Sequence, residues 1–469
     1  MGKETETRRL VIIGAGPGGY AAAFRAADLG VEVTLIDREE NPGGVCLYRG
    51  CIPAKVLLHA AKLIKQAAKA KEWGLDFGRP SIDLDRLRRS KNAVIARLAK
   101  GLGSLCRKRK IEYIQGTARF TGPDRLRIER AGGDAEETAF ETAVIATGGR
   151  SVVLPNIPMD SEYVMDSDMS LEIKEIPDSM LVIGAGYIGL EQANIYARLG
   201  SRVSVVEMAP QMLPGSDEDL VSILTDYLGG CFENIMLNSK VSGAEEAGGG
   251  IKVSFEGDAR VLNGTVYNKV LVAVGRRADT RQLGLEQTGI EPDRRGFIPV
   301  DRQRRTGNPR IFAAGDVTGD PQFAHKASHE GVVAAEVIAG RPAAFDPAAI
   351  PFVEYTEMEL AGCGLTEQQA RQEKGNVRIA RFPWSASGRA LSMGEDQGMT
   401  KLVVEEDTGR ILGAGIVGSD AGKLISQAVL AVEMAAVAED LARTIHPHPT
   451  LSETLMEAAE VFLGRSINL

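Results

Sequence analysis

Residues 10–19 read LVIIGAGPGG, an apolar run that leads directly into closely spaced glycines. The apolar run predicts a buried strand, and the glycines predict a tight turn into the helix that follows. Residues 181–191, LVIGAGYIGLE, repeat the pattern. In each copy a second apolar strand follows and ends in an acid, Asp37 or Glu207, 18 residues past the last glycine. The chain therefore predicts two separate βαβ units.

Both turns have the spacing Gly-x-Gly-x-x-Gly of a dinucleotide-binding motif. The first glycine permits the tight turn, the second lets the backbone approach a pyrophosphate, and the third allows close packing of helix on strand. The helix N-terminus then offers N–H groups and partial positive charge to phosphates. A chance glycine turn is the alternative for one motif, but two copies in the same context argue against it. The motif glycines are Gly14, Gly16 and Gly19 in the first copy and Gly184, Gly186 and Gly189 in the second.

The acid that ends each second strand can bind ribose hydroxyls. Because an acid at this place repels a 2′-phosphate, Glu207 predicts that the second site prefers NAD to NADP. A further strand-like segment, residues 311–316, ends in Gly315-Asp316. It places one carboxylate at the same edge of the sheet, although an Asx turn before Thr318 is the alternative. We interpret Asp316 as a ligand of a larger cofactor, FAD, on the first unit.

The remaining segments predict how the units are joined. Strands that end in glycine at residues 142–148 and 269–275 close the two units, and residues 311–338 return the chain to the first unit as a strand and a helix. The last third alternates strands with helices, which we expect at residues 421–437 and 452–463. We predict an α/β protein with Rossmann-like nucleotide-binding domains at 1–149 and 150–276, a return to the first at 277–347, and an α+β domain at 348–469.

Composition excludes several classes of protein. The 469 residues are 44% apolar and 25% charged, as in globular proteins rather than disordered ones. A net charge of −8 argues against a nucleic-acid partner. The polar start and the absence of a long apolar stretch predict neither an export signal nor a membrane span. Five cysteines, an odd number, do not fit a secreted disulfide framework, and we expect a cytoplasmic protein.

Residues 43–55, GGVCLYRGCIPAK, hold two cysteines five positions apart. Cys46 and Cys51 could not bridge within a regular helix, so the turn must be distorted, and Gly50 allows that. We expect a helix from about residue 56 to 72, with Pro53 in its first turn and Cys51 at its N-terminus, where a thiolate is stabilised. The alternatives are two buried apolar cysteines or half of a metal site. A metal site needs more ligands than the sequence offers, so we predict no metal and a redox-active pair.

Residues 446–453, HPHPTLSE, carry a candidate base. Each proline disfavours helical geometry in the histidine before it. A neutral imidazole is a suitable base for a thiol near pH 7, and Glu453 can fix its tautomer. Alternatively, Glu453 serves only a capping box that starts the last helix. We predict that His448 is the base and that His446 is structural.

The cysteine stretch, the paired glycine motifs, Ala314-Gly315-Asp316 and the closing HPHPTLSE together resemble the pyridine nucleotide–disulfide oxidoreductases, over essentially the whole chain from Leu10. The ending points to the lipoamide branch. The resemblance implies a homodimer joined by the C-terminal domain, FAD on the first domain and NAD on the second. It implies oxidation of protein-bound dihydrolipoamide with reduction of NAD, through a Cys46–Cys51 disulfide and a His448/Glu453 base from the partner subunit. A reductase of another disulfide or of a metal ion is the alternative.

The resemblance also implies individual roles. Cys46 meets the lipoyl sulfur, Cys51 faces the flavin, and Lys55 pairs with Glu191 near it. Lipoyl domains and the acyltransferase core of 2-oxo-acid dehydrogenase complexes, or a glycine-cleavage carrier protein, are the implied partners. The chain departs from the usual pattern at Asp37, at Tyr48, which bears on substrate approach, and at Glu357, where we expect an altered interface. The implied FAD contacts are Gly116, Thr147, Gly148, Gly149, Ala324 and His325, and the implied NAD contacts are Val241 and Gly275.

Overall fold

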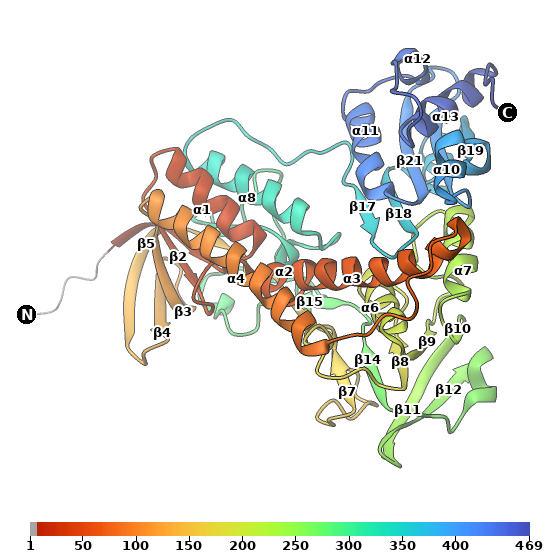
Figure 1. Cartoon of the computed structure of the whole chain (residues 1–469). Coiled ribbons are helices and arrows are strands. Elements are labelled where there is room, and N and C mark those ends of the chain that lie inside the picture. The colour runs from red at the N-terminus through yellow and green to blue at the C-terminus, as the bar shows by residue number, and fades with distance from the viewer. Residues whose placement is uncertain (1–6) are drawn as a thin grey trace, which may run out of the picture.

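The computed structural model describes residues 7–469. The first glycine motif follows Thr7–Ile13, a strand of the first sheet, whose neighbouring strands are labelled in Figure 1. Strands β1, β2, β3, β5 and β16 run parallel, while β4 joins β3 to β5 as an antiparallel strand. Helices α1 and α8 pack together against this sheet. The strands are β1 Thr7–Ile13, β2 Val33–Asp37, β3 Glu112–Gly122, β4 Arg125–Arg130, β5 Ala135–Ile145 and β16 Ile311–Ala313, and the helices are α1 Pro17–Asp28, α2 Gly44–Arg49, α3 Cys51–Lys69, α4 Leu84–Lys108 and α8 Ala324–Ile338.

The second sheet contains the second glycine motif. Its five strands are all parallel, in the order β10-β9-β8-β14-β7. A separate antiparallel sheet of β11, β12 and β13 follows, and β6 pairs with β15 where the chain crosses between the two parts. The strands are β6 Gly149–Ser151, β7 Val164–Asp166, β8 Ser179–Ile183, β9 Arg202–Val206, β10 Asn234–Met236, β11 Ser239–Ala247, β12 Gly250–Gly257, β13 Val266–Tyr267, β14 Lys269–Val272 and β15 Arg276–Ala278, and the helices are α5 Ser167–Ser170, α6 Tyr187–Leu199 and α7 Glu218–Gly229.

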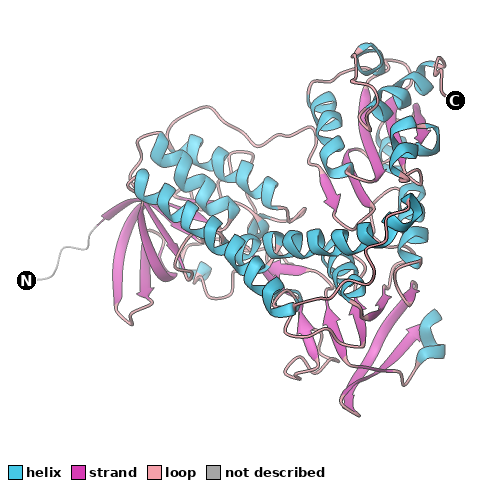
Figure 2. Ribbon diagram, in the orientation of Figure 1, coloured by secondary structure: helices cyan, strands magenta, loops and turns pink. Residues whose placement is uncertain are grey.

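The C-terminal part is an antiparallel sheet covered by helices (Figure 2). Its order is β17-β18-β21-β20-β19, and its core includes the fully buried Trp384. The strands are β17 Phe352–Glu354, β18 Glu359–Gly364, β19 Val377–Pro383, β20 Met399–Glu405 and β21 Ile411–Gly418. The helices are α9 Glu367–Glu373, α10 Gly388–Met393, α11 Ala421–Glu433, α12 Ala438–Arg443 and α13 Glu453–Leu463. Short 3₁₀ turns are η1 Ala70–Trp73, η2 Asp258–Leu262, η3 Leu285–Gln287, η4 Asp316–Thr318 and η5 Trp384–Ala386.

These sheets confirm the predicted fold class. Ile311 of β16 pairs with Ala143 of β5, so the chain returns to the first sheet after the second unit is complete. The boundaries at residues 149, 276 and 347 stay predictions. Within the described residues, no helix is long and apolar enough to cross a membrane.

Two predicted helices have different bounds. The helix expected at 56–72 begins at Cys51 and ends at Lys69. It begins early because Gly50 takes a non-helical conformation (φ −140°, ψ −110°), so α2 ends before it and α3 begins directly after it. Pro53 is tolerated within the first turn since N–H groups there have no partner in the helix. The helix expected at 421–437 ends at Glu433, because Ala435 takes a left-handed conformation (φ +53°).

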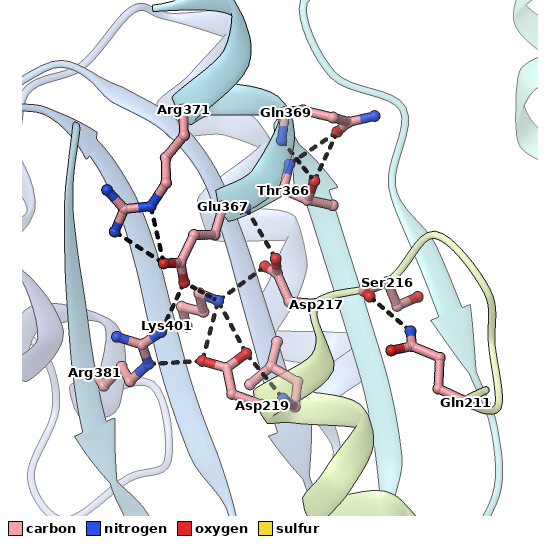
Figure 3. A network of polar contacts seen from close by, with 11 residues as sticks. Gln211, Ser216, Asp217, Asp219, Thr366, Glu367, Gln369, Arg371, Arg381 and Lys401 are labelled. Carbon is pink, nitrogen blue, oxygen red and sulfur yellow. Dashed lines mark hydrogen bonds and ion pairs between the residues drawn. The ribbon is translucent and has the colours of Figure 1, made fainter. Parts of the chain in front are cut away.

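A buried lysine joins the second unit to the C-terminal sheet (Figure 3). Lys401 of β20 is 1% exposed, and its Nζ lies 3.3 Å from Asp217, 2.9 Å from Asp219 and 2.9 Å from Glu367. Arg381 also contacts Asp219 and Glu367. Since each charge has opposite charges beside it, the cluster is compensated, as a buried ionic group must be.

Candidate active site

A cavity of about 1900 Å³ lies at the carboxyl ends of the strands of both parallel sheets. Residues that follow β1, β2, β5 and β16 line it on one side, and residues that follow β8, β9 and β14 line it on the other. Ligands of open parallel sheets bind at this edge. Cavities for single small ligands hold about 300–1,000 Å³, so this one has room for more than one such ligand.

The first and third glycines of both motifs are required by backbone geometry. Gly14 (φ +96°) and Gly184 (φ +105°) take conformations that side chains disfavour. A Cβ on Gly19 would lie 1.8 Å from the Gly14 oxygen, and one on Gly189 would lie 2.0 Å from the Gly184 oxygen. Gly19 and Gly189 therefore serve helix packing and do not line the cavity, whereas Gly14, Gly16, Gly184 and Gly186 do.

The acids that end β2 and follow β9 line the cavity and also hold the glycine turns. Asp37 Oδ2 accepts a hydrogen bond from the Ala15 N–H at 2.6 Å, and Glu207 Oε2 accepts one from the Ala185 N–H at 2.9 Å. The other oxygen of each accepts a backbone N–H two residues further on. This arrangement fixes both carboxylates at the cavity edge, and the two units share it although their sequences differ.

The other predicted cofactor residues also line the cavity. Asp316 lies deep in it, where burial raises the pKa of its carboxyl while Arg276 opposes the rise. A Cβ on Gly44 would lie 2.5 Å from the Gly16 Cα, so two glycine segments pass backbone to backbone there. This close approach leaves open the space that a pyrophosphate needs. The predicted cofactor residues that line the cavity, besides the motif glycines and acids, are Gly116, Thr147, Gly148, Gly149, Val241, Gly275, Asp316, Ala324 and His325.

The two cysteines lie at a break between two helices. Cys46 belongs to α2 and Cys51 starts α3, with the distorted Gly50 between them, and both are free thiols here. The hydrogen bond between the two sulfurs is the main cause of both pKa shifts: it lowers the pKa of Cys51 and raises that of Cys46. Lys55 also lowers the pKa of Cys51. Cys51 is thus the thiol that ionises first, in line with its place at a helix N-terminus.

Lys55 forms an ion pair beside these thiols. Its Nζ lies 2.5 Å from Glu191 Oε1, which joins α3 to α6, and 4.3 Å from the centre of the Tyr355 ring. Burial lowers the pKa of Lys55, but Glu191, together with Cys51 and Glu354, more than offsets this, so the pKa is raised. Sequence reasoning missed Tyr355 and its neighbour Glu354, because no motif marks them.

His448 and Glu453 form a pair away from the cysteines of their own chain. His448 Nδ1 lies 2.9 Å from Glu453 Oε1, while Glu453 Oε2 accepts the Thr450 N–H at 2.7 Å. Glu453 thus contacts His448 and also holds the Thr450 N–H, but α13 begins at Glu453 with Ser452 as its N-cap, so the predicted capping box is not formed. The His448 side chain is 79% exposed and does not line the cavity. His446 instead contacts Thr444 and Gln427, as a structural residue would.

Two departures from the family pattern have structural explanations. The Tyr48 hydroxyl donates a hydrogen bond to the Asn41 oxygen at 2.9 Å and so fixes the loop before α2. Glu357 is buried within its own chain, so its expected effect on the subunit interface stays a prediction. It contacts Arg198 at 2.6 Å and the Tyr227 hydroxyl at 3.1 Å. Residues 7–469 contain no cluster of three or more candidate metal ligands.

Comparisons with known proteins agree with this site. Residues 8–331 match the family model of pyridine nucleotide-disulphide oxidoreductases, and residues 350–459 match the dimerisation domain of that family. The chain is 46% identical to the dihydrolipoyl dehydrogenase of Vibrio cholerae, covering 100% of this chain and 98% of that protein. It is 47% identical to that of Haemophilus influenzae, with the same coverage.

Solved structures show the same fold. LpdA from Mycobacterium tuberculosis superposes with a TM-score of 0.89 at 26% identity, covering 97% of this chain and 99% of that one. The HOCl-induced flavoprotein disulfide reductase RclA from Escherichia coli superposes with a TM-score of 0.85 at 29% identity, covering 95% and 98%.

Proposed function

The chain belongs to the pyridine nucleotide-disulphide oxidoreductase family, and from this premise we propose that it oxidises protein-bound dihydrolipoamide to lipoamide and reduces NAD. Curated relatives at 43–47% identity over the whole chain are dihydrolipoyl dehydrogenases. The observation that carries the proposal is the unequal pair of thiols at a helix N-terminus beside an ion pair, at the edge of a cavity with two dinucleotide motifs.

The cofactors are FAD and NAD, and the residues of the cavity fit both. The first glycine turn, Asp37 and Asp316 would hold FAD, and the second turn with Glu207 would hold NAD. When bound, FAD supplies the transfer of two electrons from a dithiol to NAD as hydride. The protein supplies the thiols, the base and the charges around them.

The difference between the two thiols sets the direction of exchange. We assign Cys46 as the sulfur of the Cys46–Cys51 disulfide that the substrate thiolate attacks. The thiol of lower pKa is the better leaving group, and this is Cys51. Attack forms a mixed disulfide on Cys46 and releases the Cys51 thiolate. The second substrate thiol then displaces Cys46, so lipoamide leaves with its disulfide closed and the enzyme holds the two electrons.

The base for this exchange is His448, oriented by Glu453. Nδ1 faces the carboxylate, so Nε2 is left to take a proton from the substrate thiol and return it to the Cys46 sulfur. The protein is a homodimer, joined through the family's dimerisation domain. Since His448 is exposed and outside its own chain's cavity, we propose that it serves the disulfide of the partner subunit.

The proposed partners carry the lipoyl group. Lipoyl domains and the acyltransferase core of a 2-oxo-acid dehydrogenase complex, or a glycine-cleavage carrier protein, would present it at the cavity. The cytoplasmic location that the sequence predicts fits these partners and stays part of the proposal.

The test is NADH formation by the purified protein with dihydrolipoamide and NAD under anaerobic conditions. Turnover is expected in the wild type and its loss in Cys46→Ser, because no disulfide can then form. No turnover, in a yellow protein whose flavin NADH still reduces, would reject the substrate while keeping the scaffold. Other disulfides and metal ions would then be tried.

A further inference from the structure

Glu354 is a buried carboxyl group that the proposed reaction does not use. It ends β17 at the base of the cavity wall and is 0% exposed. Within residues 7–469, neither of its carboxyl oxygens accepts a hydrogen bond of ordinary geometry, and the backbone of Thr356 offers a weak contact. A carboxylate placed there would lose its hydration with little compensation, which is a costly state for a buried acid. The position therefore requires a chemical explanation.

The surroundings of Glu354 contain more acid than base. Burial is the main cause that raises the pKa of Glu354 well above the ordinary value, and the charge of Glu191 raises it further. Lys55 and, less, a backbone contact with Thr356 oppose this rise. Of the charged groups described, Lys55 is the one cation that acts on Glu354, and it is already paired with Glu191 at 2.5 Å. The other titratable groups around this cluster are Tyr187 on α6, Tyr355 beyond β17, Glu359 on β18 and Cys51 on α3.

The charges of this cluster balance only if one carboxyl group is protonated. Two ionised carboxylates beside one ammonium would leave a net negative charge in a region of low dielectric constant. Two acids in this situation do not both ionise. We propose that Glu354 is a positioning residue that carries the proton, so that the cluster is neutral and Lys55 keeps its charge available for Cys51.

The effect reaches the thiols through Lys55. Lys55 lowers the pKa of Cys51, and Glu191 raises it. An ionised Glu354 would draw on the same ammonium and would make the Cys51 thiolate less stable. The neutral form avoids this competition. This inference deepens the proposed function and rests on it for the role of Cys51.

The test reads the proton directly, by infrared spectroscopy of the holoenzyme. The carbonyl stretch of a protonated carboxyl group is expected in the wild type at pH 7 and is expected to vanish in Glu354→Gln. A matched control is Glu359→Gln on the neighbouring strand, which removes a partly buried carboxyl group that accepts the Gly422 N–H at 2.8 Å. This control should keep the band.

The variant Glu191→Gln gives a second, independent test, because it leaves the Glu354 side chain in place. Without the Glu191 charge, Glu354 becomes the partner of Lys55 and ionises, so the band should vanish although the carboxyl group is still present. This arm also decides the matter if Glu354→Gln does not fold. A band that is absent from the wild type, or that persists in both Glu354→Gln and Glu191→Gln, would overturn the proposal.

Thiol reactivity tests the charge of Glu354 independently of the infrared band. In the dithiol-reduced protein, the rate of Cys51 alkylation at pH 7 should be the same in Glu354→Gln as in the wild type, because both are neutral at this position. If Glu354 is instead ionised, its removal lowers the pKa of Cys51 and the rate rises about threefold or more, which contradicts the proposal. Neither measurement uses dihydrolipoamide or NAD. The inference about Glu354 can therefore fail while the proposed function holds, and the proposed function can fail while the inference holds.

Discussion

At the scale of single residues, Lys55 adds to the hydrogen bond from Cys46 in lowering the pKa of Cys51. Replacing it in Lys55→Met removes a cation that lowers the pKa of Cys51, so the pKa should rise and the thiolate fraction below that pKa should fall. An opposite charge at this range is worth one unit or more, so we expect about a tenfold slower alkylation of the reduced protein at pH 7. The pH dependence of the alkylation rate, followed at the Cys51 peptide, measures it.

The matched control for this change is Lys62→Met on the same helix. Lys62 lies 3.6 Å from Asp420 and does not contact the thiols, so its loss should leave the alkylation profile where it is. An unshifted profile in Lys55→Met, or an equal shift in both variants, would show that the local charge does not control the thiol.

The same residues show what the sequence could predict about the site. The stretch from Cys46 to Lys55 is local, so spacing and helix chemistry were enough to predict a redox pair with Cys51 at a helix N-terminus. Glu191 lies 136 residues from Lys55, and only the family resemblance joined them. Glu354 was missed, because a single acid at the end of a short strand has no pattern, and its burial depends on how β17 packs on α6.

At the scale of elements, the third glycine of each motif fixes helix against strand. In Gly189→Ala the new Cβ would lie 2.0 Å from the Gly184 oxygen, so α6 must move away from β8. We expect a loss of about 1–3 kcal/mol in the free energy of unfolding, as for an overpacked core, and weaker NAD binding with FAD retained. Denaturant unfolding and NAD titration of the yellow protein measure the two effects.

Gly229→Ala is the control for this prediction. Gly229 ends α7, and a Cβ there would have no neighbour within 4 Å, so stability and NAD binding should stay within experimental error or improve slightly. Equal behaviour of the two variants would contradict the packing role of Gly189.

Elements also show where sequence patterns stop being informative. The strand and turn of each glycine motif were predicted because hydrophobic runs and glycines are local signals. Helix ends were less accurate, since α11 stops at Glu433 although apolar residues continue. There the Ile411 N–H bonds to the Ala436 oxygen, and this contact with a distant strand ends the helix. Such a tertiary contact leaves no mark in a local window.

At the scale of the whole molecule, Lys401 holds the second unit against the C-terminal sheet. Lys401→Met would leave Asp217, Asp219 and Glu367 with Arg381, and with Arg371 at the rim, as the remaining cations of the cluster in Figure 3. Removal of one partner from a buried ion pair costs about 3–5 kcal/mol, and we expect a loss in this range in the free energy of unfolding. Arg371→Met, at the exposed rim of the same cluster, should cost less than about 1 kcal/mol. Equal losses in the two variants would show that Lys401 does not hold the second unit against the C-terminal sheet.

A dimer of two different variants distinguishes whether His448 acts in its own chain or in the partner chain. A chain with Cys46→Ser and a chain with His448→Gln are each expected to be inactive as homodimers. In a heterodimer of the two, one site combines the intact cysteines of the His448→Gln chain with the intact histidine of the Cys46→Ser chain. If the base is supplied across the interface, this site works and the heterodimer, isolated through two different tags, has about half the wild-type kcat.

If His448 acted within its own chain, every site of the heterodimer would contain one defect and no activity would return. If the base is supplied across the interface, the second site of the heterodimer lacks both Cys46 and His448. The highest kcat expected is therefore half that of the wild type. A base supplied across the interface would account for the exposure of the His448–Glu453 pair, because His448 does not line the cavity of its own chain. Each active site then depends on the association of two chains, so dilution below the dimer dissociation constant should abolish thiol oxidation while FAD stays bound.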